Sequence, residues 1–273
     1  SPDGTRIAVL VRDQVSNIWV WDLARQTLTR LTFDPAVDFV PVWVPDSRRL
    51  ILASSRAGAS NLYWQATDGT GEVERLTESP NGQFPDTITP DGRHVLFRED
   101  TTTETGSDIS AVSLQTPRTV TPIVRTFFND RNAQVSPDGR WLAYDSNESG
   151  REEIYVRPYP DVNTGRWLIS TGGGRVPLWS RDSRQLFYLA PEGVVMAVRV
   201  EAGPAWRTNT PTSALSGEYF FGAPGLQRTF DISPDGRRFL MIKENYPDGK
   251  AGQNRLVLVQ NWTEELKRLV PTN

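Results

Sequence analysis

A four-residue turn motif recurs six times along the chain and constrains the fold more than any other feature. Its copies are Ser1-Pro2-Asp3-Gly4, Val44-Pro45-Asp46-Ser47, Thr89-Pro90-Asp91-Gly92, Ser136-Pro137-Asp138-Gly139, Ser180-Arg181-Asp182-Ser183 and Ser233-Pro234-Asp235-Gly236. Serine first, proline second and glycine fourth are preferences of a type I turn. Alternating and apolar runs flank each copy, so the motif predicts a strand, a tight turn and a second strand.

The spacing of the copies predicts the architecture. Successive turn aspartates are 43 to 53 residues apart, a period typical of β-propeller blades. A four-stranded blade cannot bury both faces alone, so neighbouring blades must stack around an axis. We therefore predict an all-β, six-bladed β-propeller of four-stranded antiparallel blades, forming a single domain over residues 1–273. The expected blades span approximately 1–36, 37–80, 81–127, 128–172, 173–216 and 217–262.

Two parts of the chain depart from the repeat. The innermost strand of the first blade would precede Ser1, so either the native protein continues upstream or the C-terminal tail fills the gap. In the fifth blade a weakly patterned fourth strand is expected near Trp206. Residues 201–225 are expected to form a long loop that partly covers one mouth of the channel.

The last blade and the tail carry different signals. A polar hairpin insertion is expected over 245–254. After it, Asn261 and Glu264 fit a capping box, and the apolar residues that follow recur at helical spacing. A short C-terminal helix is therefore predicted, with an outer strand through 268–270 as the alternative.

Composition and charge exclude several functional classes. The net charge of −3, with both signs interspersed, leaves no basic stripe, so we expect no nucleic-acid partner. The chain has no cysteine, which excludes disulfides, cysteine-ligated zinc and cysteine nucleophiles. His94 is the only histidine and no Gly-x-Ser-x-Gly motif occurs, which disfavours a hydrolase triad. We expect a monomer with no cofactor. We also expect no membrane insertion, because the sequence has no run of 18 apolar residues.

The order of motifs within a blade resembles a known family. An inner strand, the Ser-Pro-Asp-Gly turn, an apolar strand, an Asn-Ile/Leu-Trp/Tyr strand and an Arg-Leu-Thr strand follow one another, most clearly over 1–32 and 44–77. This arrangement resembles the WD-like propeller repeat of the TolB family. The tail over 260–269 is similar to the end of propeller regions fused to some bacterial serine/threonine kinases. The fifth turn lacks both the proline and the glycine of the family pattern.

The resemblance implies a fold more strongly than a function. It implies a periplasmic or otherwise extracytoplasmic platform for protein binding or sensing. The same repeat also occurs in the propeller domains of prolyl-oligopeptidase-like enzymes and in some oligosaccharide lyases. Fold alone therefore does not assign the activity.

The turn aspartates are interpreted as structural residues. Identical turns on different blades are far apart on one face of a propeller. An aspartate at this place in a turn bonds to nearby backbone N–H groups. We expect all six to stabilise their own turns rather than to bind a ligand together.

Aligning the inner strands on their turns yields the candidate binding site. Five residues before each turn stand Phe39, Phe84, Arg131, Arg175 and Arg228, and one residue earlier stand Asp38, Gln83, Asp130, Gly174 and Gln227. In a propeller these strand starts surround one entrance to the axial channel. The alignment predicts two aromatic residues on one arc and three arginines on another. Such a mouth suits a small anionic ligand or a peptide segment of a protein partner.

Other interpretations remain open at this point. The three arginines could instead form ion pairs with Asp38, Asp130 and neighbouring acids, purely to close the ring. An axial-metal hydrolase or lactonase would use oxygen ligands such as Asp38, Asp86, Asp130 and Asn132, but the arginines would repel a cation. An oligosaccharide-binding or lyase propeller would need more aromatic platforms than Phe39 and Phe84. A non-catalytic binding module is the leading hypothesis.

Overall fold

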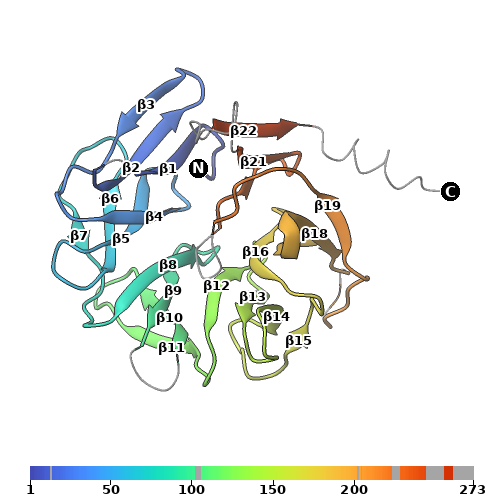
Figure 1. Ribbon diagram of the computed structural model, residues 1–273. Helices are drawn as coiled ribbons and strands as arrows, with labels where there is room; N and C mark the ends of the chain where they lie inside the picture. Colours follow the sequence, from blue (N-terminus) through green and yellow to red (C-terminus); the bar gives the residue numbers. More distant parts are fainter. Residues whose placement is uncertain are drawn as a thin grey trace.

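The strands form antiparallel sheets arranged around a central axis (Figure 1). The computed structural model describes residues 1–12, 14–101, 106–201, 203, 205–222 and 228–243, and the backbone of 255–260. Four of the sheets have four strands each, whereas the first and the last have three. The predicted all-β propeller is therefore confirmed, but the prediction of four strands in every blade holds only for the middle four sheets.

Each sheet is built from consecutive strands. The first contains β1 (Arg6–Arg12), β2 (Ser16–Asp22) and β3 (Thr27–Arg30), and the second contains β4 (Asp38–Trp43), β5 (Arg49–Ser54), β6 (Asn61–Ala66) and β7 (Glu74–Arg75). The third contains β8 (Gly82–Ile88), β9 (His94–Asp100), β10 (Ser107–Ser113) and β11 (Val120–Val124). The fourth contains β12 (Asp130–Val135), β13 (Trp141–Ser146), β14 (Glu153–Pro158) and β15 (Trp167–Leu168).

The last two sheets follow the same order. The fifth contains β16 (Arg175–Trp179), β17 (Gln185–Ala190), β18 (Val194–Arg199) and β19 (Thr212–Leu215), with the short 3-10 helix η1 (Pro191–Gly193) after β17. The sixth contains β20 (Asp231–Ile232), β21 (Arg238–Lys243) and β22 (Arg255–Gln260). No helix within the described ranges combines the length and the apolar character needed to cross a bilayer.

The six turn motifs have the predicted structure. In every copy the N–H of the fourth residue donates to the carbonyl of the first, as in Gly139 to Ser136 at 2.8 Å. The Oδ1 atom of Asp138 accepts the Ser136 hydroxyl at 2.5 Å and the N–H of Arg140 at 3.2 Å. The other five turn aspartates each accept the corresponding N–H from the residue two positions later. The structural role predicted for these aspartates is therefore confirmed.

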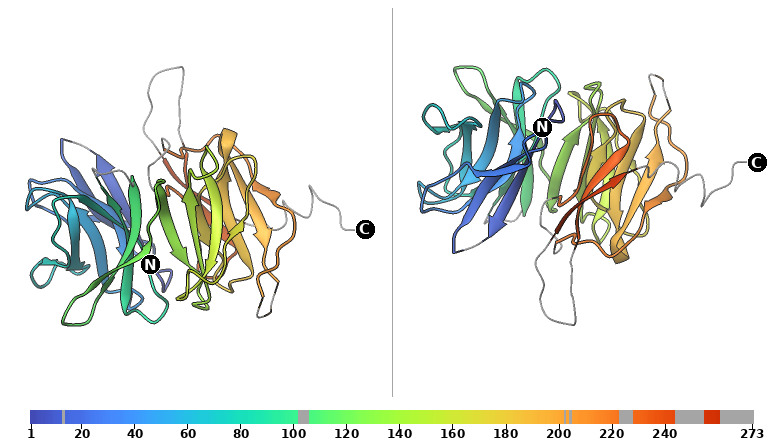
Figure 2. Two further views of the ribbon diagram at one scale, coloured as in Figure 1. Left: turned by 90° about the horizontal axis from the view of Figure 1, so that it is seen from below. Right: turned by 90° about the horizontal axis from the view of Figure 1, so that it is seen from above.

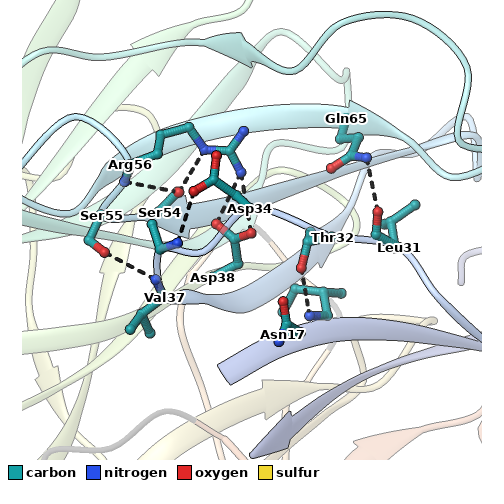
Figure 3. A network of polar contacts seen from close by, with 12 residues as sticks. Asn17, Leu31, Thr32, Asp34, Val37, Asp38, Ser54, Ser55, Arg56 and Gln65 are labelled. Atoms are coloured by element: carbon teal, nitrogen blue, oxygen red, sulfur yellow. Dashed lines mark hydrogen bonds and ion pairs between the residues drawn. The ribbon is translucent and has the colours of Figure 1, made fainter. Parts of the chain in front are cut away.

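Arg-Leu-Thr segments at the ends of the outer strands connect the last two strands in each of the first two sheets. Thr32 Oγ1 accepts the N–H of Ile18 at 3.0 Å, and Thr77 Oγ1 accepts the N–H of Leu62 at 3.1 Å. In the first sheet, the Arg30 guanidinium also donates to Asn17 Oδ1 at 2.8 Å; Figure 3 shows Asn17 beside Thr32. In these two sheets, a threonine side chain rather than a longer ladder thus satisfies a backbone N–H of the strand next to the outer one.

The apolar core lies between successive sheets. Between the fourth and fifth sheets it includes Trp141, Trp179 and Trp206, all buried. Between the fifth and sixth it includes Phe187 and Phe239, whose ring centroids are 5.2 Å apart. Similar clusters lie between the first and second, second and third, and third and fourth sheets. Each sheet buries its apolar side chains only against the neighbouring sheets, so a single sheet would not be stable alone.

Contacts between the turns connect neighbouring sheets, including the first and the last. Ser47 Oγ of the second turn accepts the N–H of Asp3 in the first turn at 3.1 Å. A Cβ added at Gly4 would lie 3.1 Å from Cγ of Pro234 in the sixth turn. The N-terminus lies beside the last sheet in Figure 1 as well.

The structure corrects the fifth sheet. Its outer strand is β19, not a strand near Trp206, and the expected loop over 201–225 therefore contains a strand. Trp206 is instead buried among the tryptophans between the fourth and fifth sheets, because its large ring stabilises more by burial there than in an exposed outer strand. The predicted helix over 261–269 and the hairpin insertion over 245–254 lie outside the described residues, and β22 occupies the positions between them.

Candidate binding site at the axial channel

The inner strands of the four complete sheets each carry an irregularity. The register of β4, β8, β12 and β16 shifts against the neighbouring strand. At this place Val40, Asn132 and Val176 have positive φ angles of 57°, 54° and 49°. β-branched residues rarely adopt this left-handed conformation, and such strain is concentrated at functional sites. The bulges therefore mark this level of the channel as a candidate site.

The inner strands enclose a cavity of about 70 Å³. Its polar lining is Asp86, Asn132, Gln134 and Arg228, and its apolar lining consists of valines and prolines from β4, β8 and β16. Pockets for drug-sized ligands usually measure about 300–1,000 Å³. The axial cavity therefore suits one small group, such as a side chain or a chain end of a larger partner.

Asp86 is the acidic group of this cavity. Its Oδ2 atom accepts the N–H of Ala133 at 3.2 Å, and its backbone carbonyl accepts Nε2 of Gln134 at 3.0 Å. Burial raises the pKa of the Asp86 carboxyl from 3.8 to about 7, against the opposing effect of Arg98 and Arg228. Asp86 therefore changes its charge near neutral pH.

A second buried carboxylate, Asp145 on β13, lies behind the cavity lining. Its Oδ2 atom accepts Nδ2 of Asn132 at 2.8 Å and the N–H of Val176 at 2.9 Å. Burial raises the pKa of Asp145 from 3.8 to about 7, and these two hydrogen bonds only partly oppose that shift. Asp145 thus holds two of the strained residues of the cavity wall in place.

The two predicted aromatic residues are brought together. The ring centroids of Phe39 and Phe84 are 5.5 Å apart. The guanidinium carbon of Arg98, on β9, lies 4.3 Å from the centroid of the Phe84 ring. Arg98 is only 8% exposed, and burial lowers its pKa. This stack places a buried cation beside Asp86.

Of the three aligned arginines, Arg228 is the one that lines the cavity. Its Nε atom donates to the carbonyl of Phe230 at 2.8 Å, and its Nη2 atom lies 3.8 Å from Asp231 Oδ1. Its Nη1 atom is 3.5 Å from the carbonyl of Pro177, at the limit of a hydrogen bond. Apart from the short Nε hydrogen bond, the two Nη atoms of Arg228 therefore make only long contacts within the described residues.

The other two arginines donate to strand and loop residues outside the cavity lining. Arg131 donates to Ser107 Oγ at 3.1 Å and to Asn129 Oδ1 at 3.0 Å. Arg175 donates to the carbonyl of Gly222 at 3.2 Å. Neither residue is among those that line the cavity.

The two aligned acids have partners of their own. Both carboxylate oxygens of Asp38 accept Nη2 of Arg56, at 3.1 and 3.2 Å (Figure 3). Asp130 Oδ2 accepts the hydroxyl of Thr126 at 2.6 Å, and burial raises the pKa of Asp130. These contacts differ from the ring of ion pairs between the aligned acids and arginines that was the structural alternative.

The oxygen ligands considered for an axial metal are also separated by their own contacts. Asp38 is paired with Arg56, Asp130 with Thr126, and Asn132 donates to Asp145. In the described part of the chain, no three histidine, cysteine, aspartate or glutamate residues are close enough together to hold a metal ion. These residues do not fit a metal-ligand set.

Sequence alignment of the inner strands missed Asp145 and Arg98. Both lie on the second strand of a sheet, whereas only the first strands were compared. A different signal was available, because each follows an apolar run and is itself buried: Asp145 follows Trp141–Tyr144, and Arg98 follows Val95–Phe97. A charged residue inside a buried strand indicates a specific partner.

Comparison with known proteins supports the fold. Residues 1–121 match the TolB β-propeller domain family. The chain is 27% identical over 189 residues to an uncharacterised peptidase of Bacillus subtilis, and 35% identical over 98 residues to an uncharacterised protein of Agrobacterium fabrum. These alignments include 54% and 36% of this chain but only 28% and 33% of the two relatives.

Solved structures share the propeller fold. TolB from Acinetobacter baumannii superposes with a TM-score of 0.61 at 21% identity, covering 77% of this chain and 52% of that protein. An oligogalacturonate lyase from Vibrio parahaemolyticus superposes with a TM-score of 0.60 at 13% identity, covering 95% of this chain and 75% of the lyase. At these identities the similarity shows the propeller fold and not the activity.

Proposed function

We propose that this chain, a β-propeller whose residues 1–121 match the TolB β-propeller domain family, is a non-catalytic binding module. Its axial channel receives a small anionic group, most simply a carboxylate carried on a peptide segment of a partner protein. The observation that carries the proposal is the 70 Å³ cavity with the guanidinium of Arg228 in its lining. A cavity of this size admits one group and leaves the rest of the partner outside.

The chemistry of the lining supports a carboxylate. Arg228 supplies charged donors, and the side-chain amides of Asn132 and Gln134 belong to the same lining. Asp86 would repel an anion when ionised, but burial raises its pKa to about 7, so the neutral form is accessible at slightly acidic pH. Binding of a carboxylate is therefore expected to strengthen as the pH falls below 7.

We also propose that the ring closes with six blades, the first and last of which are three-stranded in the described chain. The repeated turns and the approach of Gly4 to Pro234 support this proposal. Closure places Arg228 and the four complete sheets around one channel. A single channel is what the proposed binding mode requires.

The test uses two versions of one probe, the tripeptide N-acetyl-Gly-Pro-Ala with a free carboxylate and with a C-terminal amide. Titration of the whole protein is followed by NMR of the backbone amides. We expect the free carboxylate to shift Asn132 and Gln134 and the amide to leave them in place. Arg228→Ala should weaken binding at least about tenfold, since hydrogen bonds to charged groups contribute about 1.5–3 kcal/mol.

The aligned arginines supply matched controls. Arg131→Ala and Arg175→Ala remove the same charge but lie outside the cavity lining, so affinity should change less than about threefold. Arg228→Lys keeps the charge and controls for general electrostatics. Absence of binding at millimolar probe, or equal losses in all three alanine variants, would contradict an axial site centred on Arg228.

The enzymatic alternatives make different predictions. An axial-metal hydrolase would bind a divalent cation stoichiometrically, which elemental analysis of the purified protein measures directly. A lyase or peptidase would convert its substrate, whereas a binding module returns the probe unchanged. The Bacillus subtilis relative is described as a peptidase, but this chain aligns with only 28% of its length.

A further inference from the structure

A second, larger cavity lies away from the axis. Its volume is about 530 Å³, and it is bordered by the ends of β13, β14 and β15 in the fourth sheet and by the connection from β18 to β19 in the fifth. The side chains that matter for its chemistry are Arg140, Trp141, Tyr159, Thr164, Trp167 and Trp206. We call this cavity the tryptophan groove. It shares no lining residue with the axial cavity.

The aromatic residues of the groove form one packed unit. The ring centroid of Trp206 lies 5.0 Å from that of Trp141 and 5.9 Å from that of Trp167. A Cβ added at Gly165 would lie 2.8 Å from the Trp167 ring, so only glycine permits this approach. Because the rings support one another, the groove offers rigid aromatic surfaces with little ordering left to occur on binding.

Within the described residues, three indole N–H groups of the groove donate to no protein acceptor. Trp179, which is 3% exposed, donates its indole N–H to the carbonyl of Gln134 at 3.0 Å. Trp141 and Trp206 are 6% and 8% exposed, yet within the described residues neither they nor Trp167 donate a side-chain hydrogen bond. None of these three indole nitrogens is among the fully buried side-chain nitrogens that lack a partner, so their N–H groups reach solvent at the groove. Accessible donors in the lining of an aromatic groove are available to a ligand that supplies acceptors.

The donor and acceptor balance identifies the kind of ligand. Among the described residues, the lining side chains carry the indole N–H groups, the Arg140 guanidinium and the hydroxyls of Tyr159 and Thr164, and none is a carboxylate or a carboxamide. The Thr164 hydroxyl already donates to the carbonyl of Asp161 at 2.8 Å. Sugar hydroxyls donate as well as accept, and would find few side-chain acceptors here. Proline residues carry carbonyl acceptors and no N–H donor. A polyproline II segment also has a solvent-exposed backbone and suits aromatic grooves.

Charge adds a second requirement. Among the described residues of the lining, Arg140 is the only charged one, and its guanidinium carbon lies 5.4 Å from the centroid of the Trp141 ring. Its Nη2 atom donates to the carbonyl of Gly203, and its Nη1 atom lies 3.9 Å from Asp138 Oδ2 in a long, solvent-exposed ion pair. We propose that the tryptophan groove binds an extended, proline-rich segment of a partner protein that carries an acidic residue opposite Arg140. The carbonyls of the segment accept the unpaired indole N–H groups, and its proline rings pack on the aromatic faces.

The test uses a defined probe, an acetylated and amidated decapeptide of nine prolines and one glutamate. A peptide with lysine in place of glutamate tests the role of Arg140. A glycine-rich peptide with the same glutamate tests the polyproline II conformation. Binding to the whole protein is measured by isothermal titration and mapped by NMR, where shifts are expected at Thr164 and Trp167 rather than at the axial residues Asn132 and Gln134.

The variants separate hydrogen bonding from packing. Trp167→Phe keeps an aromatic ring but removes the N–H, and we expect affinity for the proline peptide to fall about fivefold. Arg140→Gln should abolish the preference for glutamate over lysine and leave binding of the prolines in place. Trp64→Phe is the matched control, because Trp64 donates to Glu74 on β7, outside the groove; its affinity should equal that of the unaltered protein.

Several outcomes would overturn the proposal. These are no binding of the proline peptide at millimolar concentration, equal binding of the glycine-rich peptide, or unchanged affinity in Trp167→Phe when circular dichroism shows an intact fold. Binding of an oligogalacturonate probe in its place would assign the groove to a carbohydrate. Shifts confined to Asn132 and Gln134 would place the peptide in the axial cavity instead, and the two sites would then be distinguished.

Discussion

At the scale of single residues, Asp145 connects two neighbouring sheets through one buried carboxylate. It lies on β13 in the fourth sheet and accepts the N–H of Val176 on β16 in the fifth. It also accepts the side-chain amide of Asn132. Removing the carboxylate would leave two buried donors unpaired, and each such donor costs about 1–3 kcal/mol. The strained wall of the axial cavity therefore depends on a residue that does not line it.

The raised pKa of Asp145 gives a pH dependence of stability with a definite sign. Its pKa in the folded protein is about 7, above its ordinary value of 3.8, so the folded state binds more protons between these two values. This contribution to the unfolding free energy is fully present below about pH 4 and is lost as the pH rises through 7. Asp145→Asn keeps the acceptor oxygen and should flatten this decline in urea unfolding measured from pH 4.5 to 7.5.

Neighbouring charges define the controls for that experiment. Glu152 and Arg131 act on Asp145, and Asp86 has a similarly raised pKa through its own burial. Asp86→Asn should therefore flatten the remaining part of the decline, whereas Asp161→Asn, at an exposed site, should leave it unchanged. A pH profile of Asp145→Asn that superposes on that of the unaltered protein would show that Asp145 is not the titrating group.

At the scale of elements, the turns explain why two of the six copies have serine in place of glycine. Ser47 and Ser183 have φ angles of 56° and 58°, which glycine would adopt more easily. Their hydroxyls compensate, since Ser47 Oγ accepts the N–H of Asp3 and Ser183 Oγ accepts the N–H of Asp138, each from the preceding turn. Each serine thus has an unfavourable positive φ angle, and its hydroxyl compensates by accepting a hydrogen bond from the neighbouring sheet.

Substitutions at Ser183 separate these two effects. Ser183→Ala keeps the unfavourable φ and loses the 3.0 Å hydrogen bond, so the unfolding free energy should fall by about 1 kcal/mol. Ser183→Gly loses the same hydrogen bond but relieves about 1 kcal/mol of left-handed strain, so stability should change little. Urea unfolding of both variants measures the difference. A more stable alanine variant than glycine variant would refute this account.

At the scale of the whole molecule, the apolar interfaces between successive sheets stabilise the fold. Apolar clusters lie between successive sheets from the first to the last, and the approach of Gly4 to Pro234 connects the two ends. The tryptophan groove occupies one of these interfaces, whereas the axial cavity uses inner strands of four sheets. One proposed site therefore lies between two neighbouring sheets, and the other lies where the inner strands of four sheets meet.

Two glycines with nearly equal φ angles test the contact between the ends. Gly4 and Gly139 have φ of 72° and 73°, so alanine at either position carries the same backbone strain. A Cβ at Gly4 meets the Pro234 ring, and one at Gly139 has no atom within 4 Å. Gly4→Ala should therefore lower the unfolding free energy by about 1–3 kcal/mol more than Gly139→Ala. Equal losses in thermal or urea unfolding would argue against packing of the first turn on the sixth.

The sequence by itself determined the strand–turn–strand repeat, the role of the turn aspartates and the meeting of Phe39 with Phe84. These features depend on local turn chemistry and on a regular period, both of which can be read residue by residue. Only the tertiary structure decided that Arg228 lines the axial cavity, that Asp145 and Arg98 support it, and that Trp206 belongs to a buried cluster. These outcomes depend on which side chains meet between neighbouring sheets, and no single repeat specifies such contacts. Bulges change the direction of the inner strands, and burial between sheets changes the pKa values of the side chains that meet there.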